Sequence, residues 1–573
     1  MKIKLPQEFQ PELLKSLKTY NKEKFMADLM AGLIVGIVAL PLAIAFGIAS
    51  GVTPEKGIYT AIIAGFIISF LGGSTVQIGG PTGAFIVIVY GIVEQYGVQG
   101  LAIATVLAGM MLLLMGFMKL GAIIKFIPYP IVVGFTSGIA LTIFSTQIKD
   151  FFGLTTPPLP SGFIEKWGVY FEHFASINWW AALVALLSVV IIVLTPKISR
   201  KIPGSLVALV VMTVVGYLLK EYAGIMSIET IGDRFTINSE LPEIEQIPIS
   251  LESIRILFPA AFTIAMLGAI ESLLSATVAD GVTGKRHNSN MELVAQGVAN
   301  IVTPFFGGIP ATGAIARTMT NINNGGRTPV AGIVHALVLL LVVLFLGDLT
   351  RHIPMACLAG VLVVVAYNMS EWRIFVSLVK QSRSTRAVLL TTFLLTVIFD
   401  LTIAIGVGLL LAVFSFLKRM NEATQVSRTT GSINITKEME STSGKTQDEI
   451  LHLPNGVEVY EIEGPFFFGV ANKFDEVMRD IHGKSHIRII RMRKVPFIDS
   501  TGLNNLETLC RNSIKEKKQV ILSGVNSDVR EKVEQSAIPG IIGQENICDN
   551  IHLAVERAVQ IDNELKEKQQ ENA

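Results

Sequence analysis

One carboxylic acid lies within a long apolar run of the sequence. Glu271 follows the apolar residues 265–270 and precedes Leu273 and Leu274. A charged carboxylate in such surroundings is costly, so we expect Glu271 to be protonated, paired or directed into a water-filled cavity. Such a group is suited to carry protons, and Ser275, one helical turn further on, could share its site. The alternatives are a neutral Glu hydrogen-bonded within a helix bundle and a serine that only packs.

Two stretches rich in glycine and proline interrupt apolar segments in a similar way. Gly72 and Gly73 precede the first break, 81–84, and residues 307–310 precede the second, 311–315. A helix that begins midway through a membrane leaves the amides of its first turn without partners, at the positive end of its dipole. Two such beginnings that face each other could bind an anion without a full positive charge.

The site predicted by this pair consists of backbone amides and two hydroxyl groups. Proline suits the first turn of such a helix, and the threonines could bind an anion or act only as helix caps. Glycine and proline could instead serve close helix packing, but a matched pair of breaks favours a binding site. The residues expected to contact the anion are Pro81, Thr82, Gly83, Ala84, Thr312, Gly313, Ala314 and Ile315.

Three further residues are candidates for the same site. Arg317 follows the second break by about one turn, and it could attract an anion, pair with Glu271 or lie at the membrane interface. Pro41 predicts a kink in the first apolar segment, so we expect Ala45 and Phe46 to line a cavity, although Phe46 could serve packing only. The charged residues after the Glu271 segment are expected to lie in a solvated loop: Asp280, Lys285, Arg286 and His287.

The composition indicates that these residues belong to a membrane protein. Of 573 residues, 51% are hydrophobic and 16% are charged, and the mean hydropathy is +0.55. Soluble proteins carry about 25% charged residues. The formal net charge of +1 gives no sign of nucleic-acid binding. The spacing of Cys357, Cys510 and Cys548 fits neither a zinc site nor a disulfide framework, so we expect no metal and no cofactor.

Hydropathy divides the chain into four parts. Residues 1–24 are polar and predict no cleavable signal peptide, 25–420 form a transmembrane domain, 421–450 a polar linker and 451–573 a soluble domain. The breaks fall in the third and tenth apolar segments, which predicts an inverted repeat of seven plus seven spans. The fourteen expected spans are centred near residues 37, 63, 88, 108, 135, 187, 211, 266, 297, 317, 338, 360, 394 and 409.

Basic residues fall on alternate loops of this arrangement. Loops rich in Lys and Arg face the cytoplasm in most membrane proteins, whereas the long loop near 221–252 is acidic. Both termini and the soluble domain are therefore expected in the cytoplasm. The basic loop residues are Lys119, Lys125, Lys197, Arg200, Lys201, Lys285, Arg286, Arg327, Arg373, Lys380, Arg383, Arg386, Lys418 and Arg419.

The soluble domain has the alternation of an α/β fold. Residues 457–462, 487–490 and 519–523 predict strands. Residues 498–503 lead from a strand into a helix, which Asp499 or Ser500 could cap. No phosphate-binding glycine motif is present, so nothing in the sequence indicates an ATP-driven pump.

Several motifs together resemble the SulP family of anion transporters, also called sulfate permeases or solute carrier 26. The segment Asp499-Ser500-Thr501-Gly502 resembles the family's cytoplasmic STAS domain, which is related to anti-sigma-factor antagonists. The motifs in the apolar part are Pro41-Leu42-Ala43, Gly79-Gly80-Pro81-Thr82-Gly83, Gly268-Ala269-Ile270-Glu271-Ser272-Leu273-Leu274, Asp280-Gly281-Val282-Thr283-Gly284, Gln296-Gly297 and Phe306-Gly307-Gly308.

The resemblance implies a uracil-permease-like fold that covers nearly the whole chain. A core domain of spans 1–4 and 8–11 would move against a gate domain of spans 5–7 and 12–14 in an elevator-like motion, within a homodimer. The resemblance also implies a regulatory position, because the serine equivalent to Ser500 is phosphorylated in the related antagonist domains.

Residue-level similarity favours one branch of the family. The sodium-coupled bicarbonate branch is similar over 285–328, but it has Asp at Glu271 and Thr at both Ser275 and Ile315. Isoleucine in place of a hydroxyl removes an oxygen from a sodium site, which favours proton coupling through Glu271. Leu42 stands where eukaryotic members usually carry Gln, so the resemblance does not imply a preference for sulfate. Three segments resemble the bacterial transporter for four-carbon dicarboxylic acids: 134–138, 147–151 and the residues around Glu271.

The expected function is proton-coupled uptake of a small oxyanion or dicarboxylate across the inner (plasma) membrane. The expected partners are the anion, protons or sodium, the lipid bilayer, a second copy of the chain and a cytoplasmic protein that binds the STAS domain. Three alternatives remain open: a sodium–bicarbonate symporter, a passive anion channel, and a membrane-anchored sensor that transports nothing.

Overall fold

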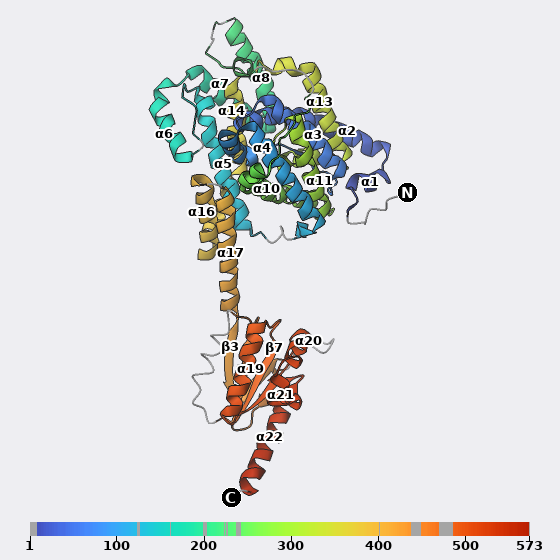
Figure 1. Cartoon of the computed structure of the whole chain (residues 1–573), viewed down its shortest axis with the longest axis vertical. Helices are drawn as coiled ribbons and strands as arrows, with labels where there is room; N and C mark the ends of the chain where they lie inside the picture. Colours follow the sequence, from blue (N-terminus) through green and yellow to red (C-terminus); the bar gives the residue numbers. More distant parts are fainter. Residues whose placement is uncertain are drawn as a thin grey trace. The chain divides into compact units, whose positions relative to one another are not determined.

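The chain forms two compact units, Met1–Ala412 and Val413–Ala573. The computed structural model describes residues 9–122, 127–160, 162–198, 203–222, 224, 227–235, 242–399, 401–436, 448–468 and 485–571. The first unit is helical, and the second contains a mixed sheet covered by helices (Figure 1). Each unit is described by itself below.

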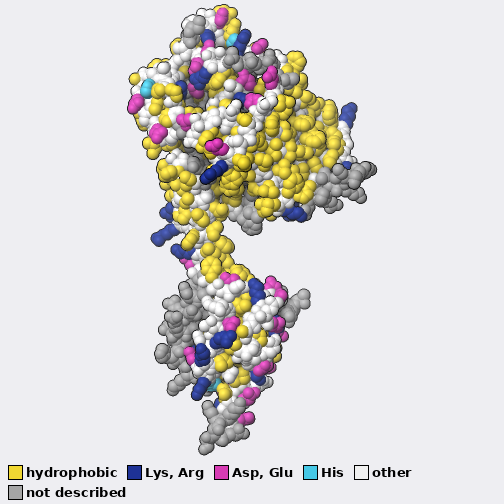
Figure 2. Space-filling model, viewed as in Figure 1, with side chains coloured by type: hydrophobic (Ala, Val, Ile, Leu, Met, Phe, Trp, Pro, Cys, Tyr) yellow, Lys and Arg dark blue, Asp and Glu magenta, His cyan; other side chains and the backbone are white. Residues whose placement is uncertain are grey.

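Long apolar helices form most of the first unit. Hydrophobic side chains cover much of its visible face (Figure 2). The exposed hydrophobic residues of this unit include Phe345 and Trp179. Among the described residues, nine helices are long and apolar enough to cross a membrane: α2 (Lys22–Ala49), α3 (Pro54–Leu71), η2 with α4 (Gly83–Phe117), α5 (Tyr129–Phe152), α7 (Trp179–Ile198), α8 (Gly204–Glu221), α10 (Leu251–Thr283), α14 with α15 (Met355–Val379), and Ile403–Ala423 within α17 (Leu401–Ala423).

Shorter elements complete the first unit. Two of them, β1 and β2, are two-residue strands. In chain order the short elements are α1 (Glu12–Leu17), β1 (Gly79–Gly80), η2 (Gly83–Phe85, before α4 at Ile86–Phe117), α6 (Phe163–His173), η4 (Phe174–Ser176), α9 (Ile231–Arg234), α11 (Ser289–Val302), η5 (Thr303–Phe306), β2 (Thr312–Gly313), α12 (Ile315–Asn323), α14 (Met355–Met369), α15 (Trp372–Val379) and α16 (Arg383–Ile398). A further apolar helix, α13, spans Val330–Thr350.

The helices do not correspond one-to-one with the fourteen expected spans. The expected centres near 88 and 108 lie in one helix, α4, which Gly97 interrupts with a φ of 70°. The centres near 297 and 317 lie in α11 and α12, which have 14 and 9 residues. A full crossing needs about 20 residues. Fewer helices therefore meet the length requirement than the hydropathy pattern predicts, and the count of fourteen stays a prediction.

The helices of the first unit pack in two groups. In one group α2 packs against α3 and α13, while α4 packs against α10 and α11. In the other, α5 packs against α14 and α16, and α7 against α8 and α14. One apolar core extends across both groups and includes the fully buried Ile44, Phe85 and Phe135. The interrupted helices belong to the first group, because β1 lies against α3 and α12 against α10.

The second unit is built on a five-stranded sheet in the order β3-β6-β7-β8-β9. The first pair, β3 with β6, is antiparallel, and the remaining pairs are parallel. The observed β6, β7 and β8 confirm the three predicted strands. The elements are β3 (Gln425–Thr430), β4 (Ser432–Thr436), β5 (Asp448–His452), β6 (Val457–Glu463), β7 (Ile487–Lys494), α19 (Ser500–Lys515), β8 (Gln519–Ser523), α20 (Ser527–Glu534), α21 (Ile538–Ile542), η6 (Gln544–Asn546), β9 (Ile547–Cys548) and α22 (Ile551–Glu571).

Two apolar clusters cover opposite faces of this sheet, because successive side chains of a strand alternate between its faces. Ile490 of β7 belongs to the cluster that contains residues of α19, α20 and α21. Its neighbour Ile489 belongs to the cluster formed with α22. Part of the expected linker 421–450 also belongs to this unit, since β3 pairs with β6, and β4 pairs with β5.

Candidate functional site

The two glycine- and proline-rich breaks meet in the first unit as a pair of short strands. β1 and β2 are antiparallel, with Gly79 opposite Gly313 and Gly80 opposite Thr312. The amide of Ala314 extends the pairing by donating to the carbonyl oxygen of Ile78 at 2.9 Å. Segments more than 230 positions apart in the sequence therefore lie side by side.

A helix begins directly after each strand of the pair. The first runs from Gly83 through η2 and α4, and the second, α12, begins at Ile315. The sequence predicts Pro81 in the first turn of its helix. In the structure this helix begins at Gly83, so Pro81 precedes it by two residues. Both helices leave their first amides without intrahelical partners close to the same strand pair, which is the arrangement that an anion site of this kind needs.

Glu271 is hydrogen-bonded to the first break. Thr82 Oγ1 donates to Glu271 Oε2 at 3.0 Å, and the Glu271 side chain, on α10, is partly accessible. Thr82 makes no capping hydrogen bond to its own helix. Its hydroxyl is bonded to the Glu271 carboxylate instead. The structure thus brings together the acid and the first break.

The second break is joined to the same helix by hydroxyl groups. The hydroxyls of Ser272 and Thr312 lie 2.6 Å apart, and Thr312 also donates to the carbonyl oxygen of Gly268 at 3.0 Å. The amide of Gly313 donates to Ser272 Oγ at 3.1 Å. Ser275, which we had expected near Glu271, instead donates to Thr318 of α12 at 3.3 Å. These bonds fix α10 against β2 and α12.

Arg317 lies behind the first break and is 2% exposed. Its guanidinium donates to the carbonyl oxygens of Gly79, at 3.3 Å, and Pro81. It forms no ion pair with Glu271 or any other carboxylate among the described residues, and its burial leaves the side chain without contact to solvent or lipid headgroups, which an interfacial arginine would make. Of the three predicted roles of Arg317, attraction of an anion remains. Its hydrogen bonds add a role that the spacing of the sequence did not suggest, which is to hold the backbone of the first break.

Apolar side chains surround Gly83. A Cβ atom on this glycine would lie 3.4 Å from Ile143 Cδ1, 3.6 Å from Met369 Sδ and 3.6 Å from Phe46 Cε1. These three residues come from α5, α14 and α2. Ala84, Ala314 and Ala45 are buried, whereas Ile315 is 37% exposed. Phe46 is therefore next to the first break, as expected, while its neighbour Ala45 lines a separate cavity.

Some contributors could not be identified from sequence. Asn300 of α11 binds Ala311 in both directions, its Nδ2 donating to the carbonyl oxygen at 2.8 Å and its Oδ1 accepting the amide at 2.9 Å. Gln77 Nε2 donates to the carbonyl oxygen of Ser272 at 3.1 Å. The sequence shows Asn300 and Gln77 only as polar residues near apolar segments. Their hydrogen-bond partners depend on the tertiary fold.

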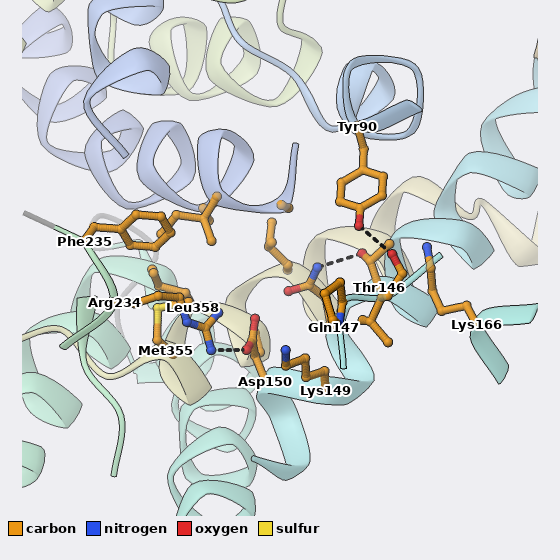
Figure 3. A pocket seen from close by; sticks show the side chains of 17 residues that line it. Tyr90, Thr146, Gln147, Lys149, Asp150, Lys166, Arg234, Phe235, Met355 and Leu358 are labelled. Carbon is orange, nitrogen blue, oxygen red and sulfur yellow. Dashed lines mark hydrogen bonds and ion pairs between the residues drawn. The ribbon is translucent and has the colours of Figure 1, made fainter. Parts of the chain in front are cut away.

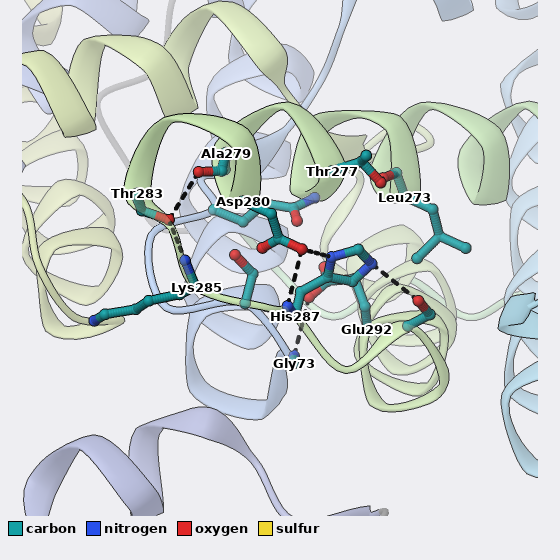
Figure 4. Close-up of polar contacts among 12 residues, drawn as sticks. Gly73, Leu273, Thr277, Ala279, Asp280, Thr283, Lys285, His287 and Glu292 are labelled. Atoms are coloured by element: carbon teal, nitrogen blue, oxygen red, sulfur yellow. Dashed lines mark hydrogen bonds and ion pairs between the residues drawn. The ribbon is translucent and has the colours of Figure 1, made fainter. Parts of the chain in front are cut away.

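The end of α10 forms a polar cluster rather than a solvated loop (Figure 4). His287 Nδ1 lies 2.7 Å from Asp280 Oδ2, and only 2% of its side chain is exposed. The nearby Glu292 is fully buried and accepts the amide of Gly73 at 3.0 Å. The expectation of solvation was therefore wrong for His287, because its two ring nitrogens are hydrogen-bonded to Asp280 and to Ser289 at the start of α11. Lys285 and Arg286 are exposed as expected.

Ser500 lies at the start of α19 in the second unit and is exposed. Asp499 caps this helix, because its Oδ1 accepts the amide of Gly502 at 2.7 Å. The other oxygen of Asp499 accepts the amide of Phe468 at 3.1 Å. Of the two predicted caps it is therefore Asp499 that serves, and Ser500 stays at the surface.

Comparison with protein families supports a transport function. The Sulfate permease family matches residues 25–392, and the STAS domain matches 451–557. The Bacillus subtilis protein YvdB, whose name marks it as a candidate sulfate transporter, is 42% identical over 535 residues, 93% of this chain and 98% of that protein. The bicarbonate transporter BicA of Picosynechococcus sp. is 31% identical over 497 residues, 84% of this chain and 85% of that protein. These relatives are named as transporters, not enzymes.

Solved structures agree with this assignment. The transmembrane domain of a cyanobacterial bicarbonate transporter BicA is 30% identical, with a TM-score of 0.60 over 69% of this chain and 98% of that one. The murine anion transporter Slc26a9 in its inward-facing state shares the fold, with a TM-score of 0.83 over 98% of this chain and 96% of that one, at 20% identity. The chain therefore belongs to the sulfate permease family of multi-pass membrane anion transporters and contains a STAS domain.

Proposed function

We propose that this protein is a proton-coupled secondary transporter that binds a small anion between the beginnings of its two interrupted helices. One observation supports this most: β1 pairs with β2, and consecutive residues of α10 bond to the two breaks, Glu271 to Thr82 at 3.0 Å and Ser272 to Thr312 at 2.6 Å. Backbone amides would bind the anion, with the Thr82 and Thr312 hydroxyls beside them. Glu271 would take up and release the coupled proton.

Nine further residues take their roles from this arrangement. Gly83 admits the anion because it has no side chain, and Phe46 closes the apolar side of the site. Ser275 and Arg317 hold α12 and the first break in place through their hydrogen bonds. The rest of the proposed lining consists of Pro81, Ala84, Gly313, Ala314 and Ile315, whereas Ala45 lines the neighbouring cavity.

Movement between two helix groups would expose this site to each side of the membrane in turn. We propose fourteen spans in a seven-plus-seven inverted repeat, a core domain that holds both breaks and a gate domain formed by the α5, α7, α8, α14, α16 and α17 helices. The packing in two groups supports this division. The transport domain would occupy 25–420, after a cytoplasmic segment 1–24 and before a linker 421–450 and the STAS domain 451–573.

The proposed substrate is a small oxyanion of the sulfate, bicarbonate or four-carbon dicarboxylate class. A relative named for sulfate and one named for bicarbonate support the first two. Amides at helix beginnings recognise negative oxygens without distinguishing these anions. Sodium–bicarbonate symport is the second candidate, supported by the likeness to BicA, but the side chain of Ile315 offers no oxygen to a sodium ion.

We place the protein in the plasma membrane as a homodimer with both termini in the cytoplasm. The STAS domain would bind a cytoplasmic protein, and the exposed Ser500 would be the position where phosphorylation changes that contact. An exposed hydroxyl at the first turn of a helix accepts a phosphate readily, since the dipole favours negative charge there.

Uptake into proteoliposomes tests the central proposal. Radiolabelled sulfate, bicarbonate and succinate are each offered with an inward proton gradient, an inward sodium gradient or neither. We expect at least one anion to accumulate above its outside concentration with the proton gradient alone. Accumulation that needs sodium would favour the symporter, and equilibration without any gradient dependence would favour a channel. Retained uptake in a chain truncated after Lys418 would exclude the sensor alternative.

A further inference from the structure

A cavity separate from the interrupted helices is lined mostly by apolar residues, and its charged side chains are mainly cations. It has a volume of about 280 Å³ and lies where the end of α2 meets α5, α6, α9 and α14. Lys149, Lys166 and Arg234 line it together with one carboxylate, Asp150 (Figure 3). The volume is close to the lower limit for small-molecule sites.

Lys166 is the unusual member of this group. It lies on α6, is only 3% exposed, and its ammonium is 5.4 Å from the centre of the Tyr90 ring. Among the described residues it forms no ion pair. Burial lowers the pKa of Lys166, and the field of Glu94 opposes this only in part. A buried ammonium without a bonded anion is rare, because taking a charge out of water is costly unless a partner compensates.

The remaining charges leave the cavity positive. Arg234 is matched, since it bonds Asp150 at 2.9 Å and Glu229 as well. Lys149, like Lys166, has no ion pair among the described residues. In Figure 3 Lys166 lies on one side of the cavity, whereas Lys149 lies on another side next to Asp150, which is bonded to Arg234. Three cations and one carboxylate therefore line one space, and the carboxylate is already bonded to Arg234.

The geometry points to an accessory binding site for a small oxyanion in this cavity, held by the ammonium groups of Lys149 and Lys166. The inference rests on the proposed transport function for its ligand class: a carboxylate, sulfate or bicarbonate with at least two oxygens. Its position suits an anion on the way to or from the interrupted helices. Ala45 lines the cavity, and the next residue, Phe46, borders Gly83. A second, wider cavity shares Lys149, Asp150 and Arg234, and would be the entrance.

Protection of the lysines from acylation tests the site directly. The purified full-length protein is treated with a neutral amine-acylating reagent, and modification of each lysine is followed by peptide mass spectrometry. Sulfate, bicarbonate or succinate is added at constant ionic strength, set with a bulky sulfonate. We expect at least one anion to slow modification of Lys166 severalfold. Lys220, paired with Asp233 at 2.6 Å, is the control and should not change. Equal rates at Lys166 with and without every anion would overturn the inference.

Transport kinetics separate this site from the central one. Lys166→Met should raise the KM of uptake severalfold with little change in the maximal rate. Lys166→Arg, which keeps the positive charge, should have a KM close to that of the wild type. Lys220→Met is the matched control. Thr82→Val should impair uptake yet preserve the protection of Lys166, and loss of that protection would show that the cavity is not an independent site. If the wild type transports none of the anions, the proposed function fails. The acylation result alone then decides whether the cavity binds an oxyanion.

Discussion

The hydroxyl of Thr82 and the carboxylate of Glu271 are joined by a hydrogen bond of 3.0 Å. The next residue, Ser272, contacts Thr312 of the second break at 2.6 Å. Consecutive residues of α10 therefore bond to both halves of the proposed anion site. When Glu271 gains a proton, one of its oxygens becomes a donor and its charge is lost. Protonation would thus change the bond to the first break directly, without a chain of intermediates.

Glu271→Gln should abolish accumulation driven by a proton gradient, because an amide keeps the shape of the acid but carries no exchangeable charge at neutral pH. Binding of the anion should persist, since the backbone amides are unchanged. Gradient-driven uptake in proteoliposomes and calorimetric titration of the anion measure the two effects. Glu252→Gln, an exposed acid on the same helix, is the control. Full accumulation in the Glu271 variant would remove it from the coupling step.

Thr82→Val should lower uptake by about tenfold, while Thr82→Ser should retain most of it. Valine has the shape of threonine without its hydroxyl, and a hydrogen bond to a charged group contributes about 1.5–3 kcal/mol. Initial rates of uptake over a range of anion concentrations provide the comparison. If valine and serine behave alike, the hydroxyl has no part in transport and only the packing at this position matters.

Gly83→Ala and Gly313→Ala should fail in different ways. The added methyl at Gly83 meets its nearest atoms at 3.4–3.6 Å, which is ordinary contact, so the fold should survive while the anion is hindered. At Gly313 it would lie 1.5 Å from Gln77 Nε2, and such overpacking costs about 1–3 kcal/mol.

Thermal unfolding and calorimetry distinguish these two glycine variants. We expect an unchanged Tm with weaker anion binding for Gly83→Ala, and a lower Tm for Gly313→Ala. Anion affinity equal to that of the wild type in folded Gly83→Ala would contradict a site at the first helix beginning.

The parts of this site that the sequence predicted are those with a local cause. Glycine and proline terminate helices within a few residues of where they stand, so the breaks at 81–84 and 311–315 could be located. An acid in an apolar segment is equally visible. The partners were not predictable: Asn300 with Ala311 and Gln77 with Ser272 are polar pairs created by packing. The same holds for Lys166, whose segment shows no feature that would place it in a cavity.

Arg317→Lys tests a role that spacing along a helix could not reveal, because a long side chain can point to several neighbours. Lysine keeps the charge but lacks the planar fork that reaches two carbonyl oxygens, Gly79 and Pro81. A buried acceptor left without its donor costs about 1–3 kcal/mol. We expect a lower Tm for both Arg317→Lys and Arg317→Met. Wild-type stability and uptake in Arg317→Lys, with loss only in Arg317→Met, would instead assign Arg317 to electrostatic attraction of the anion.

Asp499→Ala should loosen the start of α19 in the STAS domain, whereas Ser500→Ala should not. Asp499 accepts amides from Gly502 and Phe468, and loss of such a cap costs about 0.5–2 kcal/mol. Hydrogen exchange of the full-length protein, followed by mass spectrometry, should show faster exchange in α19 for Asp499→Ala alone. The exposed Ser500 side chain is free to change without this cost, which suits a regulatory position. Equally fast exchange in Ser500→Ala would mean that Ser500 stabilises the helix, and its proposed regulatory role would lose its structural basis.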